Sequence, residues 1–507
     1  MPPPKGVRHE HPIESGPRQK GRNNPQAAHR NQKVHVKYLK YLVINVILLP
    51  MSKCSQTYNS DAQIGDSAAC ATALLCGVKT NFGTVGVDNT ARFNQCESLG
   101  AGAAAVPSLV TWAQEEGGMV PFRFLLECGL PPFTPFNLTS EFYPRYKVDI
   151  CPLYENDTIY TMIAGMATGI VTNARLTHAT PAALYAHAPN RYWEDDSKVP
   201  VESRRTCKDI ARQLVEDSPG KDINVMFHFL LDHVLLVESV ILGGGRRHWE
   251  REGRRLDGRN LVDDWLRDKR RRGLLAHYVE TTEELSQLNT RHLDYLLGIF
   301  APSHMSFELD RKLSTEDEPS LSEMVTTAIR LLRRNSRGFL LVVEGGRIDH
   351  ASHYNNAYRV LDETLSLESA VLVALSEVDA TETLVVVTSD HSNMLTLGGN
   401  HNCPVFPGYD SVMSDVDGRP YSTLQFANGP KFSPGRVNAR SSAVPLKWAT
   451  HGGEDVPVFT RGPMADLLFT GTFDQSYIPH AIAFAACLGE HKKRCSVHAK
   501  NYTLLDC

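Results

Sequence analysis

The chain has 507 residues, of which 42% are hydrophobic and 22% are charged. A chain of this length can bury a large core, and we expect one large α/β domain with a smaller accessory region. The 53 basic and 57 acidic residues nearly balance, so no long-range field favours nucleic acid as a partner. Basic clusters such as Lys269 to Arg272 are predicted to lie on solvated loops and helix faces.

The two ends of the chain differ in composition from its middle. Residues 1–37 are rich in Pro, Gly, Arg, Asn and Gln, which predicts a disordered segment. We assign residues 38–495 to the main domain and residues 496–507 to a polar tail. The start does not read as a signal peptide, and the apolar run Tyr41–Met51 is too short to span a bilayer. The polar tail lacks the hydrophobic stretch of a lipid-anchor signal.

One apolar run ends in a group of metal-competent side chains. Phe339–Val343 is predicted to be a buried strand, because unbroken Leu, Val and Phe residues suit a sheet covered on both faces. Glu344 and two glycines follow, and a helix beginning near Asp349 would place Asp349 and His353 on one face, with His350 pointing elsewhere. A carboxylate and an imidazole one turn apart form half of a zinc site. Glu344, an oxygen ligand, suits a harder ion such as magnesium.

A second apolar strand repeats this pattern. Residues 384–388 form an apolar run that is followed by Asp390 and His391. Ligands of open α/β sheets bind beyond the carboxyl ends of the strands. His451 lies in a glycine-flexed loop further along. A lone histidine is more often structural than a ligand, but candidate ligands at several strand ends and glycine turns are hard to explain as coincidence.

A candidate nucleophile lies near the start of the main domain. Asp66 is a good helix N-cap residue, and the small residues that follow it favour a helix. A serine at position 67 would meet free amide donors and the positive end of the helix dipole, both of which favour a bound phosphate. For Asp66-Ser67-Ala68 alone, an ordinary helix N-cap is the simpler interpretation. Ser67 takes on a role only together with the metal-competent segments.

The remaining pattern predicts alternating strands and helices. Helices are expected over residues 103–117, 319–334, 361–374 and 477–487, and strands over residues 41–49 and 166–171. Residues 222–245 should form a strand followed by a glycine turn. The triple glycine at its end lacks the Lys-Ser/Thr of a phosphate-binding loop, so a tight turn is the better interpretation.

The motifs Glu344-Gly-Gly-Arg-Ile-Asp349-His, Thr-Ser-Asp390-His391-Ser and Thr-His451-Gly-Gly-Glu-Asp resemble the metal motifs of animal-type alkaline phosphatases. The resemblance extends from about Met51 to Cys495. It implies a central, mostly parallel β-sheet with helices on both faces, plus a small crown region over about residues 393–442 at a dimer interface. It also implies hydrolysis of phosphate monoesters at alkaline pH by a homodimer.

The resemblance implies a role for each candidate residue. Ser67 is the nucleophile that forms a phosphoserine, and Arg191 orients the phosphate with its planar fork of donors. The ions implied are two zinc and one magnesium. One zinc has Asp349, His353 and His451 as ligands, and the other has Asp390 and His391. Magnesium would lie near Thr180 and Glu344, with His178 reaching it through water.

The resemblance also bears on processing and location. It implies disulfides between Cys96 and Cys207 and between Cys487 and Cys495, and therefore an oxidising compartment. Relatives are commonly secreted or lipid-anchored, so we expect an extracellular or cell-surface location, with membrane attachment only through an anchor that this sequence does not encode. Glycosylation sequons at Asn137, Asn156 and Asn501 are compatible with a glycoprotein.

The sequence departs from the family pattern in one segment that bears on the chemistry. The family has Gly-Asp-Gly-Met-Gly after its first strand, with an aspartate that bridges the second zinc and the magnesium, whereas this chain continues with Pro50-Met51-Ser52-Lys53. The nearest carboxylates, Asp61 and Asp66, do not lie at a strand end. Insertions are expected over about residues 118–165 and 226–239. The alternative function is therefore a catalytically impaired or dead relative that acts as a binding glycoprotein. A phosphodiesterase or sulfatase is a weaker third hypothesis, because the segments around Ser67 and Thr180 resemble the monoesterases.

Overall fold

A computed structural model describes residues 51–100, 104–115, 119–122, 159–162, 165–222, 238–398, 409–413, 415, 418, 420–430 and 444–492. The predicted strand over residues 41–49, the predicted disordered segment, the polar tail and the three sequons lie outside these ranges. In the described part of the chain, no helix is both long and apolar enough to cross a membrane.

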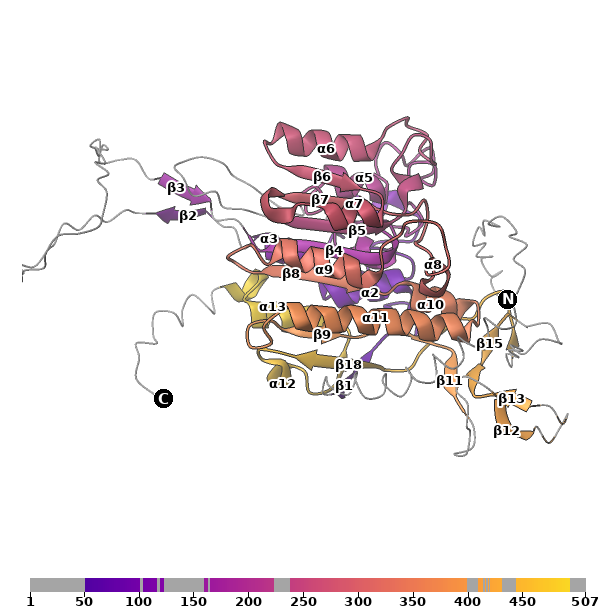
Figure 1. The fold of residues 1–507 in the computed structure, drawn as a ribbon. Helices are drawn as coiled ribbons and strands as arrows, with labels where there is room; N and C mark the ends of the chain where they lie inside the picture. The colour runs from indigo at the N-terminus through magenta and orange to yellow at the C-terminus, as the bar shows by residue number, and fades with distance from the viewer. Residues whose placement is uncertain are drawn as a thin grey trace, which may run out of the picture.

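The centre of the molecule is a parallel sheet of five strands (Figure 1). The strand order is β6-β7-β5-β4-β8, and every neighbouring pair is parallel. The strands are β4 (Ala167–Arg175), β5 (Ser239–Gly244), β6 (Ala276–Val279), β7 (Tyr295–Ile299) and β8 (Phe339–Glu344). β5 and β7 are buried along their whole length, as expected of strands covered on both faces.

Helices cover both faces of this sheet. Successive residues of a strand point to opposite faces, and Ile170 and Val171 of β4 accordingly belong to two different hydrophobic clusters. The Val171 cluster joins the sheet to α9 (Leu321–Leu332), α11 (Ala357–Glu377) and α7 (Thr282–Gln287). The Ile170 cluster joins it to α2 (Ser67–Cys76), α3 (Leu109–Glu115), α4 (Ala179–Ala183), α5 (Ile210–Glu216) and α6 (Leu261–Arg271). The predicted α/β architecture is confirmed.

A second sheet lies beside the first. It has four strands in the order β19-β1-β18-β9, namely β1 (Met51–Gln56), β9 (Val385–Val387), β18 (Val456–Arg461) and β19 (Gly471–Asp474). β8 and β9 are edge strands of their own sheets within the described residues. Both are apolar and yet only half-buried.

Several predicted boundaries differ from the structure. The helix expected over residues 103–117 begins only at Leu109, because Pro107 disfavours helical conformation in the residue before it. The helix expected over residues 361–374 extends from Ala357 to Glu377, and Asn356 caps its start by accepting from the Arg359 amide. The glycine turn after β5 is confirmed, with Gly245 at φ 105°, a conformation that L side chains rarely adopt.

Short strand pairs make up the described part of the predicted crown region. They are β11 (Leu395–Leu397) with β14 (Leu424–Phe426), β12 (Tyr409–Met413) with β13 (Pro420–Ser422) and β15 (Asn428–Gly429) with β16 (Val444–Pro445). At the ends of the predicted insertion over residues 118–165, β2 (Met119–Phe122) pairs with β3 (Ile159–Met162). The remaining elements include α8 (Glu308–Arg311), α10 (Arg347–His353), β10 (Ser392–Asn393), β17 (His451–Gly452), α12 (Ala465–Leu468) and α13 (Tyr477–Ala486).

The cysteine and basic-cluster predictions have separate outcomes. The disulfide between Cys96 and Cys207 is present. Cys487 is also disulfide-bonded, while its predicted partner Cys495 lies outside the described residues.

The prediction that the basic cluster Lys269 to Arg272 lies in solvent is wrong for Lys269, whose side chain is 1% exposed. Its ammonium packs against the rings of Trp265 and Tyr295, because the long aliphatic stem of lysine can lie along an apolar surface.

Candidate active site

The candidate nucleophile is the first residue of α2. Asp66 caps this helix by accepting hydrogen bonds from the amides of Ala68 at 3.1 Å and Ala69 at 3.3 Å. The Ser67 hydroxyl lies 2.9 Å from Nε2 of His391. The side chain of Ser67 therefore points toward the end of β9, and the helix cap fixes its position.

Three predicted ligands of the first zinc converge beside Ser67. In α10, Oδ2 of Asp349 lies 3.1 Å from Nε2 of His353. Nε2 of His451, from β17, lies 3.5 Å from Oδ1 of Asp349 and 3.2 Å from Nε2 of His353. One ligand atom from each of the three residues lies within 4.8 Å of the others. His353 and His451 are 98 residues apart in the sequence, and the fold brings their side chains together.

The outer nitrogen, Nδ1, of each of these histidines points away from the cluster, and the inner nitrogen, Nε2, points into it. The hydrogen bond that Nδ1 makes determines what Nε2 can bind. Nδ1 of His353 lies 2.6 Å from the carbonyl oxygen of Ala449, and Nδ1 of His451 lies 2.7 Å from that of Gly65. A carbonyl accepts, so each Nδ1 carries the hydrogen and each Nε2 of the neutral ring carries a lone pair. Two facing lone pairs require a cation between them. Oδ1 of Asp349 is also buried without a hydrogen-bond partner among the described residues, and this donor set fits zinc.

The pKa values of these groups reflect their burial and the short distances between the carboxylate and the imidazoles. Burial, followed by the neighbouring His391, lowers the pKa of His451 to about 4. Burial would also lower the pKa of His353, but its hydrogen bond with Asp349 raises it. In Asp349, burial is outweighed by the hydrogen bond and the charges of the histidines, which hold its pKa well below the usual range.

Asp390 and His391 lie next to this cluster. Nε2 of His391 is 3.2 Å from Oδ2 of Asp390, and the rings of His391 and His451 stack with centroids 3.5 Å apart. Burial, followed by repulsion from Asp349, raises the pKa of Asp390 to about 7. Two carboxylates held this close without a counter-ion favour a bound cation.

Arg191 connects the candidate nucleophile to a further histidine. Its Nη1 lies 2.6 Å from Oδ1 of Asp66, and its Nη2 lies 3.4 Å from Nε2 of His178. Although burial opposes it, the charge of Asp66 raises the pKa of Arg191. The guanidinium is thus fixed beside Ser67 by the same carboxylate that caps α2.

Two of the predicted magnesium residues are also in contact. Glu344, at the end of β8, accepts a hydrogen bond from Oγ1 of Thr172 at 2.5 Å and another from the Thr180 side chain. Burial raises the pKa of Glu344 to about 7, against these hydrogen bonds. The arrangement supplies oxygen ligands of the kind that magnesium prefers.

The sequence did not predict a cluster of three histidines that lies in this region. The rings of His178, His304 and His350 contact one another, with centroid distances of 5.1 Å for the first pair, 5.2 Å for His178–His350 and 4.2 Å for His304–His350. His350 does point away from Asp349 and His353, as expected. His304 lies in the loop after β7, where a single histidine gives no signal of a site.

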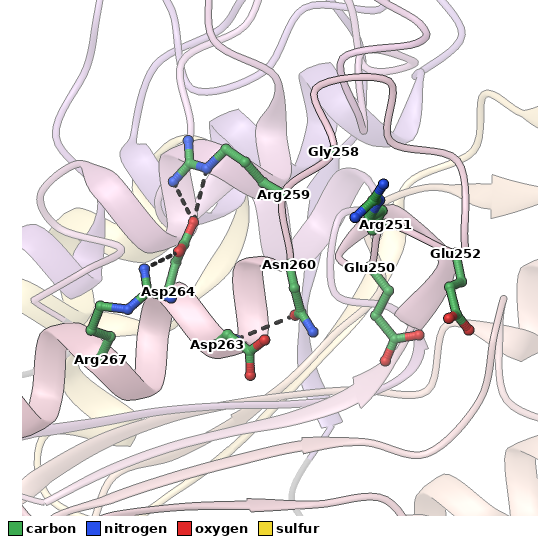
Figure 2. A pocket seen from close by; sticks show the side chains of 9 residues that line it. All are labelled: Glu250, Arg251, Glu252, Gly258, Arg259, Asn260, Asp263, Asp264 and Arg267. Atoms are coloured by element: carbon green, nitrogen blue, oxygen red, sulfur yellow. Dashed lines mark hydrogen bonds and ion pairs between the residues drawn. The ribbon is translucent and has the colours of Figure 1, made fainter.

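A separate surface hollow contains none of these residues (Figure 2). Its volume is about 670 Å³, and it lies at the start of α6. Figure 2 shows that Asp264 pairs with Arg259 at 2.6 Å and with Arg267 at 2.7 Å, while Glu250, Arg251 and Glu252 make no ion pair with another residue drawn. The hollow contains no candidate nucleophile and no histidine, so we place the candidate active site at Ser67.

Most of the chain is similar in sequence to known proteins. Residues 13–122 and 157–488 match the sequence model of the alkaline phosphatase family. The chain belongs to the alkaline phosphatase family. It is 39% identical to the tissue-nonspecific alkaline phosphatase of Gallus gallus over 89% of this chain and 79% of that protein. Identity with the human tissue-nonspecific isozyme is 36%, over 88% of this chain and 78% of the relative. The membrane-bound alkaline phosphatase of Bombyx mori is 34% identical over 88% of this chain and 74% of its own length.

Solved structures of alkaline phosphatases share the fold. The enzyme of the Antarctic bacterium TAB5 superposes with a TM-score of 0.54 at 20% sequence identity, covering 88% of this chain and 91% of that chain. The Thermus thermophilus enzyme also gives a TM-score of 0.54 at 20% identity, covering 90% of this chain and 88% of its own.

Proposed function

We propose that this chain hydrolyses phosphate monoesters through a phosphoserine formed on Ser67. The observation that supports this proposal most is the position of the Ser67 hydroxyl, 2.9 Å from Nε2 of His391. That nitrogen lies where two candidate metal-ligand groups meet, because the His391 ring also stacks on His451.

The residues that would hold metal ions divide into three sets. One zinc would be held by Asp349, His353 and His451, the second zinc by Asp390 and His391, and a magnesium by Thr180 and Glu344, with His178 acting through water. When bound, such ions stabilise the negative charge on the attacking oxygen, the leaving oxygen and the transferring phosphoryl group.

The chain's own groups position the reaction. Ser67 attacks the phosphorus as the bond to the leaving oxygen breaks, and a water molecule then cleaves the serine phosphate ester and regenerates the hydroxyl. The amides of Ala68 and Ala69 already donate to Asp66, but the positive end of the α2 dipole beside Ser67 still favours a phosphate there. Arg191, held by Asp66, presents its remaining donors to the phosphate oxygens.

The wider properties of the protein are part of the same proposal. The substrates would be phosphate monoesters as a class, because the described site offers groups for the phosphate. We propose a homodimer that uses the region around residues 393–442, and an extracellular or cell-surface glycoprotein with action at alkaline pH.

A second candidate function is a binding glycoprotein without turnover. The absence of the Gly-Asp-Gly-Met-Gly motif favours it. Asp66 cannot replace the family's bridging aspartate, because its oxygens already accept from Arg191 and from the amides of Ala68, Ala69 and Gly83. Asp61 is exposed and accepts from the amide of Phe82 instead.

The test is hydrolysis of p-nitrophenyl phosphate by the purified chain at alkaline pH with zinc and magnesium. We expect turnover that a chelator abolishes and added metal restores. Ser67→Ala should lower kcat by about 10⁴-fold or more, as removal of a nucleophile does in other covalent mechanisms. Ser60→Ala, an exposed serine in the same segment, is the matched control and should leave kcat unchanged. A folded, metal-loaded chain without turnover would instead support the binding glycoprotein.

A further inference from the structure

The histidine cluster of His178, His304 and His350 has the composition of a metal site. One nitrogen from each ring lies within 4.8 Å of the others, and all three side chains are half-buried. Three imidazoles at this spacing would suit zinc if their inner nitrogens carried lone pairs. The groups around the cluster decide whether they do.

Each of these rings faces an arginine. Nε2 of His178 lies 3.4 Å from Nη2 of Arg191, and Nδ1 of His350 lies 3.1 Å from Nη1 of Arg347. His304 faces Arg175 with both nitrogens, since Nδ1 lies 3.2 Å from its backbone amide and Nε2 contacts its Nη1. This is the reverse of the zinc cluster, where the outer nitrogens of His353 and His451 face carbonyl oxygens.

The arginines determine which nitrogen carries the hydrogen. A guanidinium donates and never accepts, so a ring nitrogen that faces it must offer a lone pair. The other nitrogen of a neutral imidazole then carries the hydrogen. His178 therefore presents Nδ1–H, and His350 presents Nε2–H, whereas both nitrogens of His304 face donors of Arg175 and offer no N–H to a ligand. A metal ion cannot bind an N–H group, and three guanidinium charges would repel it.

Two donors at this cluster have no acceptor. Nδ1 of His178 and Nε of Arg347 are both buried without a hydrogen-bond partner among the described residues. A buried donor without an acceptor destabilises the folded state, and two such donors around one cluster indicate a missing acceptor. Glu194 offers no relief, because its two oxygens are taken by Nε and Nη2 of Arg175 at 2.7 Å each.

We propose that the N–H groups of His178, His350 and Arg347, which lie around His304, form a binding site for a phosphate-like oxyanion. A tetrahedral oxyanion offers several acceptor oxygens and a negative charge, which match converging N–H groups in an arginine-rich setting. The site borders the Ser67 centre, because His178 also belongs to the proposed magnesium set and contacts Arg191, but its phosphate is separate from the one at Ser67 and does not depend on whether Ser67 turns over substrate.

The test counts phosphates bound to the Ser67→Ala chain, in which no phosphoserine can form. Equilibrium dialysis with radiolabelled inorganic phosphate should give two phosphates per chain. Replacing Arg191 by Ala should remove one of them, and His304→Asp should remove the other, because the new carboxylate supplies the missing acceptor. Arg347→Gln removes the buried charge and should weaken the same phosphate by at least about tenfold.

Thermal unfolding gives a readout that does not depend on affinity. Without phosphate, His304→Asp should unfold at a higher temperature than its parent, because its carboxylate accepts from donors that are otherwise unpaired. Phosphate should raise the unfolding temperature of the parent more than that of His304→Asp. One phosphate that only Arg191→Ala removes would overturn the proposal. Loss of a zinc equivalent in His304→Asn would also overturn it, since the cluster would then be a metal site.

Discussion

At the residue scale, the partner of each histidine's outer nitrogen distinguishes two clusters that look alike in composition. Carbonyl oxygens of Ala449 and Gly65 lie behind His353 and His451, which leaves lone pairs directed inward. Arginines lie behind His178 and His350, which leaves N–H groups directed inward. The same residue type thus supports a cation site in one place and an anion site in the other.

The role proposed for Arg191 depends on the shape of its side chain as well as its charge. Arg191→Lys keeps the charge but loses the planar fork that binds Asp66 and a phosphate together. We expect KM for p-nitrophenyl phosphate to rise by about tenfold or more, with a smaller change in kcat. Steady-state kinetics would check this, with the exposed Arg251→Lys as the matched control. An unchanged KM would contradict the proposed contact with phosphate.

Sequence patterns predicted most of the candidate ligands but not their surroundings. Asp349, Asp390 and His391 follow predictable strand ends, and the structure brings them together. His304 could not be predicted, because it approaches His350 only through the loop after β7. The carbonyl partners of His353 and His451 come from distant segments that have no motif of their own.

At the element scale, helix caps explain where several helices begin. Ser320 and Glu323 form a complete capping box at the start of α9, the helix that covers one face of the parallel sheet. Pattern analysis predicted this helix within two residues at each end, because its apolar residues recur at helical spacing. It placed the start of α3 too early, because it overlooked the start signal of Pro107 and Ser108, whose hydroxyl accepts from the Thr111 amide.

Removing this cap should be measurable in stability. Ser320→Ala should lower the free energy of unfolding by about 1 kcal/mol, because the Glu323 amide loses its side-chain acceptor and the Glu323 carboxylate loses the Ser320 hydroxyl. Urea denaturation would measure the change. Ser322→Ala, two residues further along the same helix, is the control and should change stability by less. Equal effects of the two substitutions would argue against the capping box as the cause.

Lys269 in α6 should make stability depend on pH. Burial lowers its pKa from the ordinary 10.5 to about 8, so in this range the unfolded chain binds more protons than the folded chain. Its cost to stability is fully present below about pH 8 and disappears as the pH rises to about 10.5.

A substitution isolates this effect. Relative to Lys269→Met, the parent should gain about 3 kcal/mol of stability between neutral pH and about pH 10.5. The exposed Arg270→Met in the same helix controls for the loss of a positive charge. A difference between parent and Lys269→Met that does not vary with pH would show that Lys269 titrates normally.

At the scale of the whole molecule, the candidate active site depends on two sheets whose strands β8 and β9 end near each other. Glu344 at the end of β8 and Asp390 after β9 are close enough for their charges to interact. The α/β class was expected from the length of the chain and its apolar strands, and the resemblance to alkaline phosphatases implied the central parallel sheet. The division into two sheets did not, because strand pairing depends on contacts between distant segments, and the strand predicted over residues 41–49 lies outside the described residues.

The central claim is that segments around α10, β9 and β17 converge to hold zinc beside Ser67. The most direct measurement is the zinc content of the folded chain after dialysis against zinc and removal of the excess. We predict about two zinc ions per chain, with loss of one in His353→Gln and no loss in His292→Gln, an exposed histidine. A chain that is folded by circular dichroism and holds no zinc after this treatment would contradict the account.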